Sequence, residues 1–417
     1  MLSALHHRNY RLFFTGQGLS LIGTWMQRIA MSWLVYQLTN SPFLLGFVGF
    51  AGQIPTLLLG SIAGVFVDRW SRYRVMLITQ TLSMIQASLL AVLVLRGSIA
   101  VWHIFFLAIS LGVINAFDMP ARQSFVIDMV EDKEDLSNAI ALNALMVNGA
   151  RLAGPSLAGL AVAAFGEGIC FLLNALSFLA IILALLGMKI RVSEGERPTA
   201  RPFEDLKEGY RYAFGFAPIR YLLLLLGLVS VMGMPYTVLM PVFARDVLHG
   251  GPHTLGFLMG AVGVGAVISA GYLASRKSVM GLGRVIVFGC SMFGLGLITL
   301  SLSHYVTLSL IAMLVTGFGM LSTMTSCNTI LQTIVDEDKR GRVMGFYAMA
   351  IMGMTPFGSL MAGSLASHIG APNTVALGGI SCVAAGLLFA KQLPMLRKIV
   401  RPIYAAHGII QGPPVLP

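Results

Sequence analysis

Long apolar runs recur along the whole chain, separated by short polar stretches. An apolar run of about 20 residues is long enough to cross a bilayer as a helix. Apolar and polar positions do not alternate within these runs, so the short alternating strands of a membrane β-barrel are not predicted. The pattern predicts twelve membrane-spanning helices, near residues 10–38, 43–67, 75–95, 101–121, 139–165, 169–188, 219–241, 254–275, 285–303, 306–329, 344–367 and 373–391.

Two stretches of the chain repeat at a nearly constant offset. Residues 154–166 (GPSLAGLAVAAFG) align without gaps with residues 358–370 (GSLMAGSLASHIG), 204 positions later. The acidic stretches VEDKED from Val130 and VDEDKR from Val335 match at an offset of 205. Two matches at nearly one offset indicate internal duplication. Many secondary transporters are built from such repeats, with the substrate site between them near the bilayer midplane.

The predicted fold is an all-α integral membrane protein with two pseudo-symmetric halves of six helices. Residues 1–188 form the first bundle and residues 219–391 the second. The segment 189–218 is long, polar and mixed in charge, which predicts a cytoplasmic linker. Its 204–212 part is either a short amphipathic helix on the membrane surface or an ordinary solvated connector. Residues 392–417 form a predicted cytoplasmic tail.

The composition agrees with a membrane protein. The chain is 56% hydrophobic and 11% charged, with a mean hydropathy of +0.81, whereas soluble domains carry about 25% charged residues. The net charge of +11 suggests nucleic acid at first sight. However, with the N-terminus inside, 24 of the 28 Lys and Arg fall in inner segments, which is a strong positive-inside pattern. We therefore expect a multi-pass protein of the cytoplasmic membrane, with both termini cytoplasmic and no nucleic-acid partner.

Several other classes of protein are disfavoured by missing motifs. The four cysteines lie far apart in apolar runs, so neither a disulfide framework nor a metal site is predicted. His-Glu-x-x-His and Gly-x-Ser-x-Gly do not occur, which argues against a membrane-embedded enzyme. No Gly-Lys pair exists, so the chain has no P-loop and no ATP-driven cycle of its own. We expect no cofactor, and a monomer.

The stretch after the second span contains an acid followed by a basic run, Gly64-Val-Phe-Val-Asp68-Arg69-Trp-Ser-Arg72-Tyr-Arg74. Gly64 permits close helix approach, and Arg72 lies one turn from Asp68 as its cationic partner. The stretch resembles the loop signature of the major facilitator superfamily. In the second half, Ser275 stands where the Asp would be. The resemblance implies that a cluster gates the cytoplasmic side of the outward-open state, consisting of Gly64, Asp68, Arg69, Arg72, Arg74 and Asp118.

The fifth span carries a sequence that resembles the Gly-Pro signature of exporters in this superfamily, Ala150-Arg-Leu-Ala-Gly154-Pro155-Ser-Leu-Ala158-Gly159. Ala150 and Ala158 replace two of the usual glycines. Pro155 removes a helical hydrogen bond, and Gly154 and Gly159 let a bend pack tightly, which is also all that a structural kink requires. Residues 23–42 and 116–122 further resemble the branch that contains enterobactin exporters and macrolide efflux pumps. This resemblance implies export by alternating access.

On the predicted boundaries every acidic residue lies in a loop or at a span end, and two basic residues lie within spans, Arg28 and Arg151. An Arg at a helix centre costs about 2.5 to 3.5 kcal/mol on insertion scales and marks a functional site by default. One hypothesis is that either Arg attracts an anionic group of the substrate, and the other is that both are held by helix carbonyls or snorkel to water. Polar residues that share a helical sector with them complete the predicted substrate pathway: Thr24, Gln27, Arg28, Asn143, Asn148 and Arg151.

The predicted function is secondary active export of amphipathic small molecules, siderophore-like or drug-like, with anionic ones as an option. The coupling ion in this hypothesis is a proton exchanged for the substrate, with Asp68 or Asp118 as the carboxylate that carries it. The alternative is a facilitator or flippase of a lysophospholipid-like substrate, which requires no embedded acid. The expected partners are therefore a small-molecule substrate, the lipid bilayer and protons. Transport with and without an imposed pH gradient separates the two hypotheses.

Overall fold

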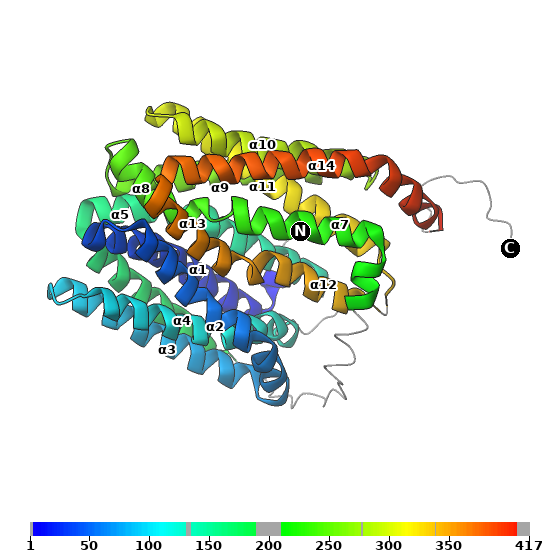
Figure 1. The fold of residues 1–417 in the computed structure, drawn as a ribbon. Coiled ribbons are helices and arrows are strands. Elements are labelled where there is room, and N and C mark those ends of the chain that lie inside the picture. Colours follow the sequence, from blue (N-terminus) through cyan, green and yellow to red (C-terminus); the bar gives the residue numbers. More distant parts are fainter. Residues whose placement is uncertain (1–2, 131–134, 189–209, 277, 338, 407–417) are drawn as a thin grey trace. The chain divides into compact units, whose positions relative to one another are not determined.

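The computed structural model describes residues 3–130, 135–188, 210–276, 278–337 and 339–406. The described residues are almost entirely helical (Figure 1). Backbone contacts divide the chain into two compact units. Unit 1 contains residues 1–198 and 238–260, and unit 2 contains residues 199–237 and 261–417. The predicted linker at 189–218 includes the boundary near residue 198, but most of it, including the proposed amphipathic stretch up to residue 209, lies outside the described residues.

Unit 1 is formed mainly by five long helices. Within it, α1 packs on α5, α2 on α4, and α3 on both α4 and α5. The end of the short helix α8, the π-helix η4 and the start of α9 complete the unit. The helical segments are η1 (Ser3–His6), α1 (Arg8–Thr39), α2 (Pro42–Arg69), α3 (Arg72–Leu95), α4 (Val101–Asp128), α5 (Leu136–Leu186), the end of α8 (Tyr236–Val242), the π-helix η4 (Phe243–Val247) and the first part of α9 (Pro252–Ala274).

Local sequence explains where these helices begin and end. The Ser41 side chain accepts a hydrogen bond from the Leu44 backbone N–H, and Pro42 occupies the first position of α2, as expected at a helix N-terminus. Ser71 caps α3 in the same way. Within α5, Gly166 has φ 80° and ψ 171°, which breaks the helix between the fifth and sixth predicted spans. Only glycine adopts this conformation without strain.

The repeat found in the sequence appears again at the level of the backbone. Gly370, which aligns with Gly166, has φ 83° and ψ 155°, and it separates α13 (Thr355–Ile369) from α14 (Ala371–Ala406). Two aligned glycines therefore end two helices in the same left-handed conformation, which supports internal duplication.

In unit 1, the helix ends that are predicted to face the cytoplasm share one apolar core. Tyr10, Phe13, Phe125 and Met76 are fully buried there. The Tyr10 hydroxyl donates to the Ala139 carbonyl at 2.8 Å, and ties α1 to the start of α5. Nearby, His7 Nε2 lies 2.9 Å from Asp135 Oδ2. Hydrogen bonds from Ser3 and His7 lower the pKa of the Asp135 carboxyl.

Unit 2 is built around α10, which packs on both α11 and α14. The π-helices η3 and η5 interrupt the helices of the seventh and eleventh predicted spans. Such π-helical turns are rare and are often found at functional sites. The segments of unit 2 are α7 (Ala217–Leu228), η3 (Val229–Gly233), the start of α8, the rest of α9, α10 (Leu282–Leu302), α11 (Val306–Ile334), α12 (Arg340–Ala348), η5 (Met349–Gly353), α13 and α14.

The predicted spans coincide with helices of the structure, and ten helical stretches of the described residues are long and apolar enough to cross a membrane. The 51-residue α5 counts once among the ten, although Gly166 divides it. Several helices are longer than predicted, and the two largest extensions are those of α4, from residue 121 to Asp128, and α14, from 391 to Ala406. Residues 392–406, assigned to the tail from the sequence, are therefore helical.

Candidate functional site

Two arginines of unit 1 lie against the same aromatic ring. Arg28 and Trp25 are three residues apart on α1, and the Arg28 Cζ lies 4.8 Å from the centre of the Trp25 ring. Arg151, on α5, places its Cζ 5.7 Å from the same ring. Both distances are within the range of cation–π interactions. The structure thus brings together the two arginines that the sequence places within predicted spans.

The charges around Arg28 are of the same sign as its own. The two charged groups that act on it electrostatically are Arg151 and Arg122. Among the described residues its guanidinium makes no hydrogen bond or ion pair, and its side chain is exposed. Cations at this spacing repel one another. An arrangement of this kind can bind an anion and offers it an aromatic face beside the guanidinium groups.

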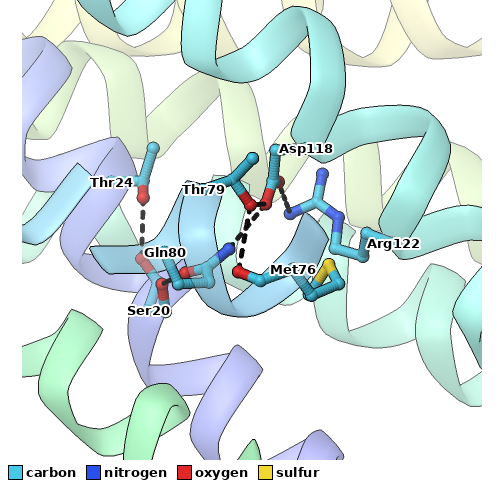
Figure 2. Close-up of polar contacts among 7 residues, drawn as sticks. All are labelled: Ser20, Thr24, Met76, Thr79, Gln80, Asp118 and Arg122. Atoms are coloured by element: carbon cyan, nitrogen blue, oxygen red, sulfur yellow. Dashed lines mark hydrogen bonds and ion pairs between the residues drawn. The ribbon is translucent and has the colours of Figure 1, made fainter. Parts of the chain in front are cut away.

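A second polar cluster of unit 1 surrounds Asp118 on α4 (Figure 2). One carboxylate oxygen accepts hydrogen bonds from Thr79 Oγ1 at 2.9 Å and from Gln80 Nε2 at 2.7 Å, both on α3. The other oxygen lies 3.9 Å from Arg122 Nη1, one turn further along α4. Gln80 also accepts from Ser20 on α1 at 3.5 Å. Asp118 therefore links α3 and α4, and Gln80 continues the connection to α1.

The structure buries Asp118 and continues α4 beyond the end predicted for this span. The residue is only 5% exposed, and α4 continues for ten residues beyond it, to Asp128. At 1.5 Å per residue, this distance is about 15 Å. The helix therefore extends beyond residue 121, where the sequence predicted the end of the span. A carboxylate is thus buried inside a membrane-spanning helix, next to a guanidinium.

The other predicted pathway residues do not join the arginine pair. Gln27 is buried, donates to Gln86 Oε1 at 2.9 Å and accepts from Asn174 Nδ2 at 2.7 Å, so it ties α1 to α3 and α5. Thr24 and Asn148 donate to backbone carbonyls of their own helices. Asn143 has a buried Oδ1 without a hydrogen-bond partner in the described part of the chain. A role of these four residues in the pathway stays a prediction.

The predicted gating cluster is only partly assembled. Arg72 Nη1 donates to Asp128 Oδ1 at 3.0 Å, not to Asp118. The side chains of Asp68 and Arg69 lie outside the described residues. Arg74 is exposed. No described heavy atom lies within 4 Å of the place that a Cβ on Gly64 would take, so the close helix approach expected at this glycine is absent from the described residues.

The exporter motif of α5 lies where three helices of unit 1 meet. A Cβ added to Gly154 would overlap Trp25 on α1, and one added to Gly159 would lie 2.6 Å from the Cα of Gly256 on α9. Backbone angles depart from helical values at Gly166, not at Pro155. In the described structure the motif therefore acts through close packing, and Gly154 sets the distance between α5 and the ring that both arginines contact.

Polar side chains of η4 form hydrogen bonds with residues at the end of α1. Tyr36 donates a short hydrogen bond to Asp246. Arg245 donates to Asn40 Oδ1 at 2.8 Å and covers the Tyr36 ring at 5.8 Å. These contacts, together with those of Gly256, are the physical reason that residues 238–260 belong to unit 1, although the sequence analysis places them in the second bundle.

Sequence reasoning missed several residues of this site. Trp25 has no signal of its own, because an aromatic residue in an apolar run is ordinary. The polar stripe of α3 did have a signal, since its members recur at helical spacing. Within the described residues no group of three or more side chains is arranged to hold a metal ion. The missed residues are Trp25, Thr79, Gln80, Gln86, Arg122 and Asn174.

Comparison with known proteins places these features in a family. The family model described as transmembrane secretion effector matches residues 1–402. The staphyloferrin A transporter of Staphylococcus aureus is 26% identical over 380 residues, covering 91% of this chain and 95% of that protein. The multidrug efflux pump Tap of Mycolicibacterium fortuitum is 26% identical over 386 residues, covering 89% and 92%. Macrolide efflux protein A of Streptococcus pyogenes is 22% identical over 396 residues, covering 91% and 96%.

Solved structures share the fold. A crystal structure of a POT family transporter in complex with 5-aminolevulinic acid matches with a TM-score of 0.72 at 13% identity, covering 93% of this chain and 96% of that one. At this identity the likeness concerns the arrangement of helices alone.

Proposed function

The chain belongs to the transmembrane secretion effector family of the major facilitator superfamily, and on that premise we propose that it exports amphipathic, anionic small molecules by alternating access. It is a multi-pass membrane transporter and not an enzyme. The proposal includes twelve helices in two halves, in the cytoplasmic membrane, with both termini cytoplasmic. The aligned repeats and the positive-inside pattern support this topology.

The observation that carries the substrate class is the pair of arginines on Trp25. Arg28 has no anionic partner among the described residues, and its charged neighbours are cations. A carboxylate, sulfonate or phosphate of the substrate supplies the missing charge, because guanidinium groups bind such groups through two parallel hydrogen bonds. The Trp25 ring offers an apolar face to the rest of the molecule. Relatives named for a siderophore and for drugs support small organic molecules as the substrate class.

The proposed coupling is proton antiport, with Asp118 as the proton carrier. Its carboxylate is buried inside α4, 3.9 Å from Arg122, which in turn acts electrostatically on Arg28. An anion also leaves a negatively charged interior down the membrane potential, by about 2.3 kcal/mol per charge per 100 mV. The pH gradient and the potential are therefore to be imposed separately on proteoliposomes. Transport that ignores the pH gradient counts against antiport and favours the facilitator or flippase of a lysophospholipid-like substrate.

The anion site is tested with two probes that differ by one charge. 8-Anilinonaphthalene-1-sulfonate is an aromatic anion, and N-phenyl-1-naphthylamine has similar rings without the sulfonate. We expect Arg28→Gln and Arg151→Gln each to weaken binding of the sulfonate at least about tenfold, since a hydrogen bond to a charged group contributes about 1.5 to 3 kcal/mol. Binding of the neutral amine should change less than twofold. Arg96→Gln, an exposed substitution after α3, is the matched control.

Folding of each variant is checked by size-exclusion chromatography and circular dichroism. Unchanged binding and transport of the sulfonate by both folded variants contradicts the anion site. Equal affinity of the unmodified protein for both probes contradicts it as well.

A further inference from the structure

A groove on unit 2 is lined by residues other than those of the site in unit 1. It has a volume of about 490 Å³ and is formed by α10 and α14. Its α10 side includes Arg284 and Phe288, one turn apart, and its α14 side includes Leu393 and Arg397, also one turn apart. Residues at this spacing share one face of a helix. The groove is therefore bounded by two facing stripes, one from each helix.

The groove has one charged end and one apolar end. A Cβ on Gly283 would meet Leu393, and one on Gly386 would meet Cys290, so α10 and α14 run antiparallel. Arg284 is the third residue of α10, and Arg397 comes after the apolar positions of α14. The two arginines thus lie at the same end, with Leu393 beside them, while Val287, Phe288, Ser291 and Ala390 line the rest.

Neither arginine is neutralised by the protein. Both side chains are exposed, and in the described part of the chain neither makes a hydrogen bond or ion pair. The sequence contains no Asp or Glu between Asp246 and Asp336 and none after Asp338. Hence no helix that packs on this groove, α11 included, carries an acid. The described helices therefore supply no negative charge to this end of the groove, and a bound anion would supply one.

The length of α14 places the charged end at the membrane surface. Its 36 residues extend about 54 Å, whereas the hydrocarbon core is about 30 Å thick. About 20 residues from Ala371 cross the core, so that Arg397 lies at the level of the headgroups. The positive-inside pattern predicts that this is the cytoplasmic surface. Basic pockets between helices at that surface bind anionic headgroups.

We propose that this groove binds an anionic phospholipid of the cytoplasmic leaflet. Its phosphate lies between Arg284 and Arg397, and an acyl chain lies along Phe288 and Leu393. Guanidinium groups match phosphate oxygens in geometry and in charge. The apolar lining selects a lipid over free phosphate, because a free ion would leave that lining exposed to water. The groove shares no residue with the proposed substrate site, and the proposal does not rest on which molecule is exported.

The test measures lipid binding to the full-length protein by native mass spectrometry. Equimolar dioleoyl phosphatidylglycerol and dioleoyl phosphatidylcholine are added to the detergent-solubilised protein. We expect the unmodified protein to retain phosphatidylglycerol preferentially. In R284Q/R397Q the affinity for phosphatidylglycerol should fall about thirtyfold, at about 1 kcal/mol for each basic residue near an anionic surface. The control K398Q/R401Q removes the same charge from exposed positions outside the groove and should change the affinity less than threefold.

A second variant tests the groove without changing its charge. Ala390 lines the apolar part, so A390W fills that space and should also abolish the preference for phosphatidylglycerol. Three results overturn the proposal: a preference that survives in R284Q/R397Q, an equal loss in K398Q/R401Q, which indicates diffuse surface attraction, and displacement of the lipid by millimolar inorganic phosphate, which indicates a free-phosphate site. The arginine variants change exposed side chains, so their folding is expected to be intact.

Discussion

The buried polar residues of the two units differ in kind. Between residues 17 and 174, they include amides and a carboxylate as well as hydroxyls, whereas between residues 230 and 374 all of them are Ser or Thr. The contrast is not one of hydropathy, since both regions contain helices apolar enough to cross a membrane. The difference is whether the buried polar side chains require a hydrogen-bond partner on another helix.

Amides and carboxylates in unit 1 hold different helices together. Gln27 is bonded to Gln86 on α3 and to Asn174 on α5, and Asp118 on α4 accepts from α3. An isolated buried amide is costly, so each of these side chains requires its particular neighbour. The first region therefore specifies its helix pairs by directional hydrogen bonds, and it is there that the arginines and the aromatic ring also lie.

Several buried hydroxyls in unit 2 donate within their own helix, and Ser269 and Ser322 pair between α9 and α11 at 2.7 Å. Thr316 donates to Ala312 and Thr323 donates to Gly319, each four residues earlier. Helix contacts there depend on glycines: a Cβ on Gly317 of α11 would overlap the Val262 carbonyl of α9. Small residues at helix interfaces let backbones approach closely in lipid. The comparison suggests that the first region carries the chemistry and the second provides a closely packed frame.

The largest predicted effect removes the carboxylate of unit 1. Asp118→Ala leaves Gln80 and Arg122 without their acceptor, and we expect it to lower the free energy of unfolding by about 3 kcal/mol. Unfolding in a titration with sodium dodecyl sulfate measures the change. Asp128→Ala, which removes the exposed partner of Arg72, should cost less than about 1 kcal/mol. Equal effects of the two substitutions would show that the buried hydrogen bonds of Asp118 add nothing to the stability of unit 1 beyond an exposed ion pair.

A glycine substitution in unit 2 is expected to have the next largest effect. Gly317→Ala forces α9 and α11 apart, at a cost of about 2 kcal/mol from overpacking. Gly271→Ala is the control, because no heavy atom lies within 4 Å of its added Cβ. It should leave the unfolding midpoint in the same titration within error. If Gly317→Ala were as harmless as the control, backbone approach would not be what holds unit 2 together.

The smallest effects compare one amide with one hydroxyl. Gln86→Leu breaks the bonds to Gln27 and to the Leu107 carbonyl, and we expect a loss of about 1 kcal/mol, within the range for interhelical hydrogen bonds in membranes. Thr316→Val removes a bond within one helix and should cost under about 0.5 kcal/mol. Thermal unfolding in detergent ranks the two variants. A larger loss for Thr316→Val would reverse the comparison.

Part of the candidate site could be predicted from the sequence, and the rest could not. Arg28 and Arg151 were identified because charged residues in apolar runs are rare. Their common contact with Trp25 could not be identified, since it depends on how closely Gly154 brings α5 to α1. The burial of Asp118 by Thr79 and Gln80 could not be predicted either, because hydropathy measures composition along one segment and does not reveal partners on another helix.

The sequence by itself indicated the positions of the apolar helices, the internal repeat and the charged residues within apolar runs, because these depend on composition and spacing along the chain. Only the tertiary structure decided which of those residues meet. Arg72 pairs with Asp128 instead of Asp118, and Gln27 lies inside the helix packing instead of with Arg28. The reason is that side-chain partners are chosen by helix rotation and distance, and these arise from packing between segments far apart in the chain.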